Sequence, residues 1–501
     1  MKVSRFLKDL FSTGFSQIGV LLFGVLLLKV MAAALSKEYL GLFFIIRRLV
    51  AVLLPMVTLN LSIGLARYAG TESGKSESYL NISLVTTAVL SSIIFIVLSL
   101  FHKSFAVLFF EDSRYSPFVF VLVLFLFANM VFLVAYSYFR GKLNMTAANV
   151  LKVLFYGFPL VLALVLMAVK TVDHSTALHL YFLIYSLYGA IISFYFLRGQ
   201  FSLAGITGIL KKKLTAALLE SRDLFHFSLV RVPTVLFNAL IFGFPVFMAT
   251  HKISLAAAGY MGIVVAVLRL LEVFSMPFNM IFLPKFSSLK EKKEMENIKT
   301  YSRVVLDFIL TFLPVMAITL FGLTRFIVLL WFGADYLTAS DSVAIAILFS
   351  MFYLAFALVR GILDGLFTFP FNNIISLAGF VALVGLSYLM GTDIFNLSLA
   401  FGTGLAVLGV MSVWLLVKKL GLKIPWKQLL TAIAVSSTLF LALNFSDGFL
   451  KGFQLKDLHS FAICVLYRIP LVFLTWFFYW RKTLWYNEVM KRVTFKVKRE
   501  K

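Results

Sequence analysis

The side chains in this sequence that can do chemistry are cations placed inside apolar runs. Arg47 and Arg48 lie within YLGLFFIIRRLVAVLLP, residues 39–55, and Arg269 lies within a second such run. A charged side chain at the centre of a bilayer costs at least about 2.5–3.5 kcal/mol on insertion scales. Guanidinium groups bind phosphate oxygens through paired, charge-assisted hydrogen bonds. The three arginines are therefore candidate substrate-binding residues.

Glu272 lies one helical turn after Arg269 and on the same face of the predicted helix. Two interpretations are open: the pair neutralises itself within the helix, or the carboxylate titrates and gives up its partner cation to an anionic substrate. The second interpretation would couple substrate binding to a proton or sodium gradient. Asp307 is the other acid embedded in an apolar run, and we predict both acids as ion-coupling residues.

Lys29 and Arg231 complete the predicted substrate-binding set, and each has an alternative role. Lys29, near the outer end of the first run, serves equally well as an interfacial anchor. Arg231, near the inner end of its run, would meet either a substrate from the cytoplasm or phospholipid headgroups. Arg47 and Arg48 have an alternative too, because residues 49–66 could span alone and leave both arginines snorkelling at the outer interface.

The elements that must position these residues are membrane-spanning helices. Of 501 residues, 61% are hydrophobic and 14% are charged, against an average of about 25% charged residues in soluble domains. Apolar runs long enough to span a bilayer as helices recur along the whole chain. We predict an all-α polytopic membrane protein with fourteen spans, over residues 12–34, 39–66, 79–101, 116–138, 147–169, 176–197, 225–249, 257–284, 302–323, 342–363, 371–390, 394–417, 428–445 and 460–480.

The charge distribution indicates membrane orientation rather than nucleic-acid binding. The net charge is +24. With the N-terminus inside, the loops on its side hold 31 Lys and Arg residues, Arg360 included, and the opposite loops hold 8. By the positive-inside rule, both termini are predicted to be cytoplasmic. Seven cations remain embedded, and two of these, Lys152 and Arg468, are interpreted as lipid or structural contacts.

Motifs for enzymatic chemistry are not found in the sequence. There is one cysteine, and the six histidines have no metal-ligand spacing. Neither a P-loop nor a glycine-rich dinucleotide loop occurs. We therefore predict a transporter with no catalytic residues, no bound metal and no cofactor.

Two of the predicted spans share an internal repeat. The shared order is Tyr-x-Gly, then Arg, then Pro, and it reads Tyr39, Gly41, Arg48 and Pro55 in one span and Tyr260, Gly262, Arg269 and Pro277 in the other. Six spans separate the two copies, so both halves of the chain have the same orientation. If both halves aim these arginines inward, the guanidinium groups line one cationic cavity.

The repeat predicts two six-helix lobes related by an axis along the membrane normal. The N-terminal lobe, spans 1–6, covers residues 1–200, and the C-terminal lobe, spans 7–12, covers 201–420. Spans 13 and 14 follow within 421–480, and 481–501 is predicted to be a basic amphipathic cytoplasmic tail.

These segments resemble the polysaccharide (O-antigen unit) flippase family of the multidrug/oligosaccharidyl-lipid/polysaccharide exporter superfamily. LKDLFSTGFSQIG…LLLKVMAAALSKEYLGLFFIIRRL is similar to the family's first hairpin. AAAGYMGIVVAVLRLLEVFSMPFNMIFLPKFSSL is similar to its eighth span, and FGADYLTAS, residues 332–340, to the loop before its tenth.

The resemblance implies two helical lobes around a central cavity and transport by alternating access. The implied substrate is an undecaprenyl-pyrophosphate-linked oligosaccharide, moved from the cytoplasmic to the periplasmic leaflet of the bacterial inner membrane. Membrane lipids, a polysaccharide polymerase and a chain-length regulator are the further partners that it implies. Carried over to this chain, the role of receiving the anionic substrate falls on Arg47, Arg48 and Arg269.

Other functions remain as alternatives. The Arg269-x-x-Glu272 step and the fourteen spans also resemble lipid II flippases of the same superfamily. The drug-exporting branch relies on embedded carboxylates, of which this chain has few. A membrane glycosyltransferase or polysaccharide polymerase is disfavoured, because such enzymes need sizeable extramembrane loops and the predicted external loops are short.

Overall fold

The described part of the chain is helical, with no strand among the described residues. The structure is a computed structural model. It describes residues 3–69, 76–169, 172–201, 207, 221–390, 392–450, 473, 477, 479, 483 and 485–487.

Twelve helices within these ranges are long and apolar enough to cross a membrane, and they match the first twelve predicted spans. Each has 20 to 33 residues, and about 20 residues are needed to cross the hydrocarbon core. The predicted fold class, an all-α polytopic membrane protein, is confirmed. The twelve are Ser12–Ala34, Lys37–Thr58, Ser76–Leu100, Ser113–Gly141, Met145–Ala168, His174–Leu197, Arg222–Lys252, Leu255–Ser275, Met295–Gly322, Ala334–Leu366, Phe371–Met390 and Ile394–Leu420.

The remaining two predicted spans are described only in part. The helix α20 (Trp426–Leu450) forms where the thirteenth span is predicted. Most of the fourteenth span and most of the predicted tail lie outside the described residues.

Packing divides the chain into two compact units, Met1–Gly262 and Ile263–Lys501, which we call unit 1 and unit 2. The division falls inside α13 (Leu255–Glu272). It differs from the predicted boundary at 200/201, because α11 and α12 pack on α3 and α2 and are grouped with them. The two predicted lobes follow from the order of the spans along the chain, whereas units 1 and 2 follow from packing. The lobe boundary at 200/201 therefore stays a prediction.

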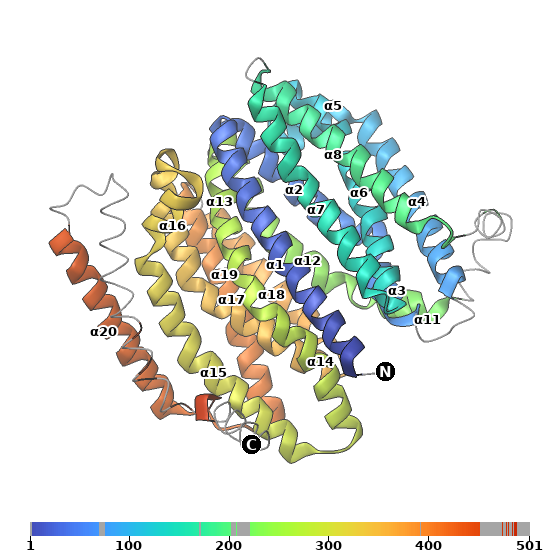
Figure 1. Ribbon diagram of the computed structural model, residues 1–501. Coiled ribbons are helices and arrows are strands. Elements are labelled where there is room, and N and C mark those ends of the chain that lie inside the picture. The colour runs from blue at the N-terminus through green and yellow to red at the C-terminus, as the bar shows by residue number, and fades with distance from the viewer. Residues whose placement is uncertain are drawn as a thin grey trace. The chain divides into compact units, whose positions relative to one another are not determined.

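Unit 1 is built around one central helix, α6, which contacts α2, α3, α4, α5, α7 and α8 (Figure 1). The helix α1 packs mainly on α7, and α12 packs on α2. The helices of this unit are α1 (Val3–Ala34), α2 (Lys37–Thr58), α3 (Leu61–Tyr68), α4 (Ser76–Leu100), α5 (His102–Phe110), α6 (Ser116–Gly141), α7 (Met145–Ala168), α8 (His174–Leu197), α11 (Arg222–Leu229), α12 (Val232–Lys252) and the first turns of α13.

Unit 2 is built in the same way around α17, which contacts α14, α15, α16, α18 and α19. The helix α20 packs on α15. Besides the end of α13 and α20, its helices are α14 (Met276–Glu291), α15 (Met295–Gly322), α16 (Thr324–Phe332), α17 (Ser340–Leu366), α18 (Phe371–Met390) and α19 (Ile394–Leu420).

Both spans that carry the sequence repeat are interrupted helices, although the sequence predicts them as continuous. The helix α2 contains Pro55 in its last turn and ends at two left-handed residues, Leu59 (φ 46°) and Asn60 (φ 57°), before α3 begins. The helix α13 ends in a 3₁₀ turn, Val273–Ser275, and Pro277 lies in the first turn of α14. Because proline lacks a backbone donor and crowds the preceding turn, each break falls close to the repeated proline.

The glycines of the repeat allow close helix packing inside unit 1. A Cβ atom on Gly41 of α2 would overlap the carbonyl oxygen of Leu255 at the start of α13. A Cβ atom on Gly262 would overlap the ring of Phe44. The Tyr-x-Gly step therefore brings α2 and the first turns of α13 into backbone contact, as small residues do in membrane helices.

Candidate functional site

The helix α2 places Arg47 against the aromatic interior of unit 1. Its guanidinium carbon lies 5.2 Å from the centroid of the Phe43 ring, which is one turn earlier on the same face. The guanidinium also interacts electrostatically with three tyrosines of α7 and α8, Tyr156, Tyr181 and Tyr185. Ring faces attract cations, and phenol groups can donate hydrogen bonds to an anion. An anion bound to Arg47 could therefore also accept hydrogen bonds from these tyrosines.

Arg48 has different neighbours from Arg47, because consecutive residues on a helix point about 100° apart. Its backbone and Cβ lie beside Gly243 of α12, about 4 Å from the position of a Cβ built on that glycine. Both arginines are partly exposed. The structure places them in unit 1, and their convergence with Arg269 in one cavity stays a prediction of the repeat.

In unit 2, Arg269 and Glu272 form the predicted ion pair, with 2.5 Å between Nη1 and Oε2. The hydroxyl of Tyr353, on α17, donates to the other carboxylate oxygen, Oε1, at 2.7 Å. The side chains of Arg269 and Glu272 are 32% and 20% exposed. The pair is thus held in place from a second helix and still reachable by a polar ligand.

A second cation faces the same carboxylate. Arg360 interacts electrostatically with Glu272. It lies within α17, seven residues after Tyr353 and on the same helix face. The sequence predicts Arg360 in an inner loop, and the structure instead places it in the spanning helix α17. Unit 2 therefore combines two guanidinium groups, one carboxylate and one phenol.

This combination can exchange ligands. A buried carboxylate needs its cation, since separating the two leaves an uncompensated charge. A phosphate group that binds Arg269 competes with Glu272, which then keeps the hydrogen bond from Tyr353 and the weaker electrostatic attraction of Arg360. Such an exchange would leave Glu272 available to a proton or a sodium ion.

Arg231 lies at the junction of α11 and α12, as the N-cap residue of α12. Its Nη1 donates to the carbonyl oxygen of Phe227 at 3.0 Å, and its guanidinium carbon lies 3.8 Å from the centroid of that ring. Arg67, from α3, approaches the same ring at 4.3 Å. Arg231 thus helps to hold the α11–α12 junction, and its predicted role as a ligand stays a prediction.

Lys29 and Asp307 occupy contrasting positions. Lys29 is an exposed residue of α1. Asp307, on α15, is 1% exposed, and its Oδ2 accepts a hydrogen bond of 3.1 Å from the backbone N–H of Trp485. The indole ring packs edge-on against Phe308, with centroids 5.4 Å apart. Asp307 anchors part of the C-terminal segment, and its ion-coupling role stays a prediction.

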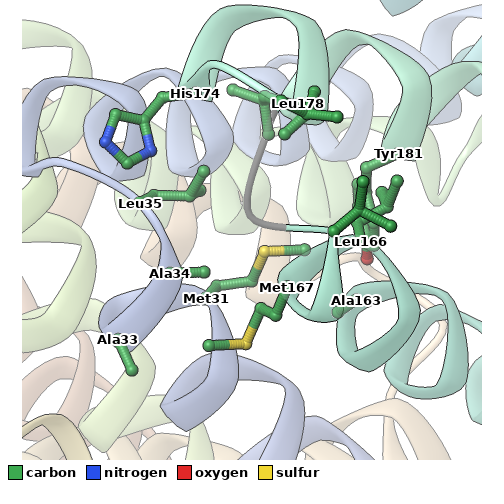
Figure 2. Close-up of a pocket in the computed structure, with 13 residues that line it drawn as sticks. Met31, Ala33, Ala34, Leu35, Ala163, Leu166, Met167, His174, Leu178 and Tyr181 are labelled. Carbon is green, nitrogen blue, oxygen red and sulfur yellow. The ribbon is translucent and has the colours of Figure 1, made fainter.

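A pocket of about 300 Å³ opens at one end of unit 1, between α1, α7 and α8. Figure 2 shows that its labelled side chains are mostly apolar, with His174 and Tyr181 as the polar members. Tyr181 also interacts with Arg47, so the pocket borders the aromatic surroundings of that arginine. Among the described residues, no group of three His, Cys, Asp or Glu side chains could hold a metal ion.

Sequence reasoning missed the residues contributed by other helices. Tyr353 and Arg360 are 81 and 88 positions from Glu272 in the chain, and only their mutual spacing of two helical turns signals a shared face. The tyrosines around Arg47 come from α7 and α8 in the same way.

Solved structures that share this fold are transporters of lipids or drugs. The lipid II flippase MurJ in an inward closed conformation matches with a TM-score of 0.69 and 15% identity, covering 95% of this chain and 99% of that chain. An inward-facing multidrug resistance MATE family transporter of the MOP superfamily matches with a TM-score of 0.64 and 12% identity, covering 80% and 94%. A mutant form of the Vibrio cholerae MATE transporter VcmN matches with a TM-score of 0.53 and 14% identity, covering 82% of this chain and 98% of that chain.

No protein-family model and no curated protein matches the sequence. At these low identities the structural likeness concerns the fold. The chain is a multi-pass membrane protein with the fold of MOP-superfamily transporters.

Proposed function

We propose that this protein is a flippase for an undecaprenyl-pyrophosphate-linked oligosaccharide, which it moves from the cytoplasmic to the periplasmic leaflet by alternating access. The observation that carries the proposal is the Arg269–Glu272–Tyr353 group in unit 2. A diphosphate loses its water when it crosses hydrocarbon, and embedded guanidinium groups replace that solvation. The fold, shared with a solved lipid flippase, supports this class of substrate.

In the proposed mechanism, the diphosphate takes Arg269 from Glu272. Electrostatic interactions are stronger in the low dielectric of the protein interior than in water, so the exchange favours the more highly charged anion. The released carboxylate then binds a proton or a sodium ion, which couples the cycle to an ion gradient. Arg47 and Arg48 supply further cations for the same substrate.

We further propose that the protein resides in the bacterial inner membrane with both termini in the cytoplasm. The support is the excess of Lys and Arg residues in the loops on the N-terminal side. With this orientation the substrate is loaded on the side where its glycosyl units are assembled. A polysaccharide polymerase and a chain-length regulator would then use the product on the opposite side.

A lipid II flippase is the second candidate, and the match to MurJ over 95% of this chain favours it. Both candidates bind a lipid diphosphate, so the cationic groups do not separate them. The resemblance of the N-terminal hairpin and the eighth span to polysaccharide flippases supports the first candidate.

The test is export of surface polysaccharide in cells that depend on this protein. Arg269→Ala is expected to reduce export at least about tenfold, because a hydrogen-bonded charge pair contributes roughly 1.5–3 kcal/mol. Arg325→Ala, at an exposed position in the same unit, is the matched control and should export normally. Membrane levels of each variant are measured by immunoblot, and normal export from an Arg48→Ala/Arg269→Ala double variant would reject the proposal.

Complementation separates the two candidates. Rescue of a strain depleted of its peptidoglycan flippase would favour lipid II as the substrate. Failure of that rescue, together with restored surface polysaccharide in a flippase-deficient host, would favour the oligosaccharide.

A further inference from the structure

A second group of cations lies in unit 1, at the end where α6 stops and α7 begins. The guanidinium carbon of Arg140 lies 5.4 Å from the centroid of the Tyr136 ring, and Lys152 Nζ lies 5.8 Å from the same centroid. The two cations also interact electrostatically with one another. Two like charges thus share one phenol ring.

Lys152 is the unusual member of this group, because its side chain is buried. The residue is 9% exposed, and it lies seven residues after the first residue of α7, which is about 10 Å along the helix. No described carboxylate lies within ion-pair distance of Lys152 or Arg140. From the sequence, Lys152 is expected to be a lipid or structural contact, but a lysine that merely faces lipid headgroups keeps its ammonium group accessible.

Burying an ammonium group without a counter-charge is unfavourable, and a nearby guanidinium increases the penalty. An anion bound between Lys152 and Arg140 would remove both costs. Phosphate suits this position, since it accepts hydrogen bonds from Arg and Lys together. The phenol groups of Tyr136 and Tyr156 are further donors, because Tyr156 is one turn after Lys152 and interacts with Tyr136.

We propose that Lys152, Arg140 and Tyr136 form a phosphate-binding site in unit 1, distinct from the Arg47 group on α2. Tyr156 also interacts with Arg47, so one tyrosine lies between the two cationic groups of this unit. The rings of Tyr136, Phe132 and Phe155 form a continuous stack, with centroid distances of 5.7 Å and 3.9 Å. A diphosphate bound at Lys152 would therefore lie beside this ring stack and close to Tyr156, which interacts with Arg47.

The phosphate has two possible sources, the diphosphate of a lipid-linked substrate and the headgroup of a phospholipid. Assigning the first source rests on the proposed function, whereas the site itself does not. The experiment therefore measures binding and uses one probe for each source.

The full-length protein, purified and delipidated in detergent, is titrated with inorganic pyrophosphate by calorimetry, and phosphatidylglycerol adducts are counted by native mass spectrometry. Lys152→Met is expected to weaken binding of at least one probe tenfold or more. Lys152→Arg, which keeps the charge, should stay within about threefold of wild type. Lys142→Met is the matched control, because Lys142 is exposed and lies 4.9 Å from the ring of Tyr138.

A thermal melt gives a second readout. Removing an uncompensated buried charge should raise the melting temperature of the ligand-free protein, and it should abolish the further rise caused by the probe. If Lys152→Met does not fold, Arg140→Gln carries the test, since Arg140 is exposed. Unchanged binding of both probes by the charge-removing variants would overturn the site. Transport is not measured, so a failure of the proposed function would not affect this result.

Discussion

The carboxylate of Glu272 has a defined position because two helices hold its two oxygens. Arg269 pairs with Oε2 from the same helix, and the Tyr353 hydroxyl donates to Oε1 from α17. A carboxylate with one donor on each oxygen is fixed in orientation. When a substrate takes Arg269, the tyrosine keeps Glu272 in place, so the ion pair can form again after release.

Replacing Tyr353 by Phe tests this role. The substitution removes one hydrogen bond to a charged group in a largely buried site, and it should lower the free energy of unfolding by about 1.5–3 kcal/mol. The measurement is denaturant unfolding in detergent. Tyr195→Phe, at an exposed position of α8, should leave stability unchanged. Equal stability of the Tyr353 variant and wild type would mean that the hydroxyl does not support the carboxylate.

The sequence predicts residue pairs on one helix and fails for pairs between helices. The Arg269–Glu272 pair follows from its spacing of three residues. Tyr353 does not, because the contact depends on how α13 packs against α17. Lys152 illustrates the same limit: its apolar neighbours predict a span, but its burial depends on α6.

Three helices in this protein start at polar cap residues that follow short connections. Ser36, Asp173 and Asp393 each accept a hydrogen bond from a backbone N–H three residues later. Caps of this kind satisfy donors that a helix leaves unpaired at its first turn. They fix where α2, α8 and α19 begin.

The cap at Asp173 should make stability depend on pH. Hydrogen bonds from the Thr176 hydroxyl and backbone N–H lower the pKa of Asp173 below its usual 3.8. The stabilisation is therefore complete above that value and is lost as the pH falls through the lower pKa of the folded state. Thermal melts should show Asp173→Ala less stable than wild type at pH 7, with the difference shrinking below pH 3.8.

Asp173→Asn is the control for this cap, because asparagine accepts the same hydrogen bond without titrating. It should stay close to wild type at pH 7 and keep its cap in acid. A difference between Asp173→Ala and wild type that persists unchanged below the lowered pKa would contradict the cap as its cause.

The close packing of α2 against the start of α13 predicts the effect of a substitution at Gly41. Gly41→Ala should destabilise the protein and lower its yield, because the added Cβ overlaps the carbonyl oxygen of Leu255. Gly24→Ala, in α1, meets no atom within 4 Å and should be neutral or slightly stabilising. Melting temperatures and gel-filtration profiles compare the two. If both variants behave alike, α2 and the start of α13 are not packed backbone to backbone.

The elements themselves were largely predictable, since apolar runs of membrane length leave few alternatives to a helix. The breaks were less so. The positions of Pro55 and Pro277 mark the breaks roughly, but the residue type of Leu59 does not signal its left-handed conformation (φ 46°), which residues other than glycine rarely adopt.

At the scale of the whole molecule, Lys and Arg residues are concentrated in the loops predicted on the N-terminal side of the membrane. The positive-inside rule then predicts one orientation for all spans. Fusions of green fluorescent protein to either terminus should fluoresce, and alkaline phosphatase fused after residue 112 should be active. Active phosphatase at the C-terminus would contradict an even number of spans.

The contact between Asp307 and Trp485 joins positions 178 residues apart. At a translation rate of about 5–20 residues per second, the amide that meets this carboxylate is made roughly 10–35 s after it. During that interval α15 enters the membrane before its C-terminal neighbour exists. A chain truncated before Trp485 would leave Asp307 permanently without this contact. Insertion and folding of unit 2 should therefore depend on the segment that carries Trp485.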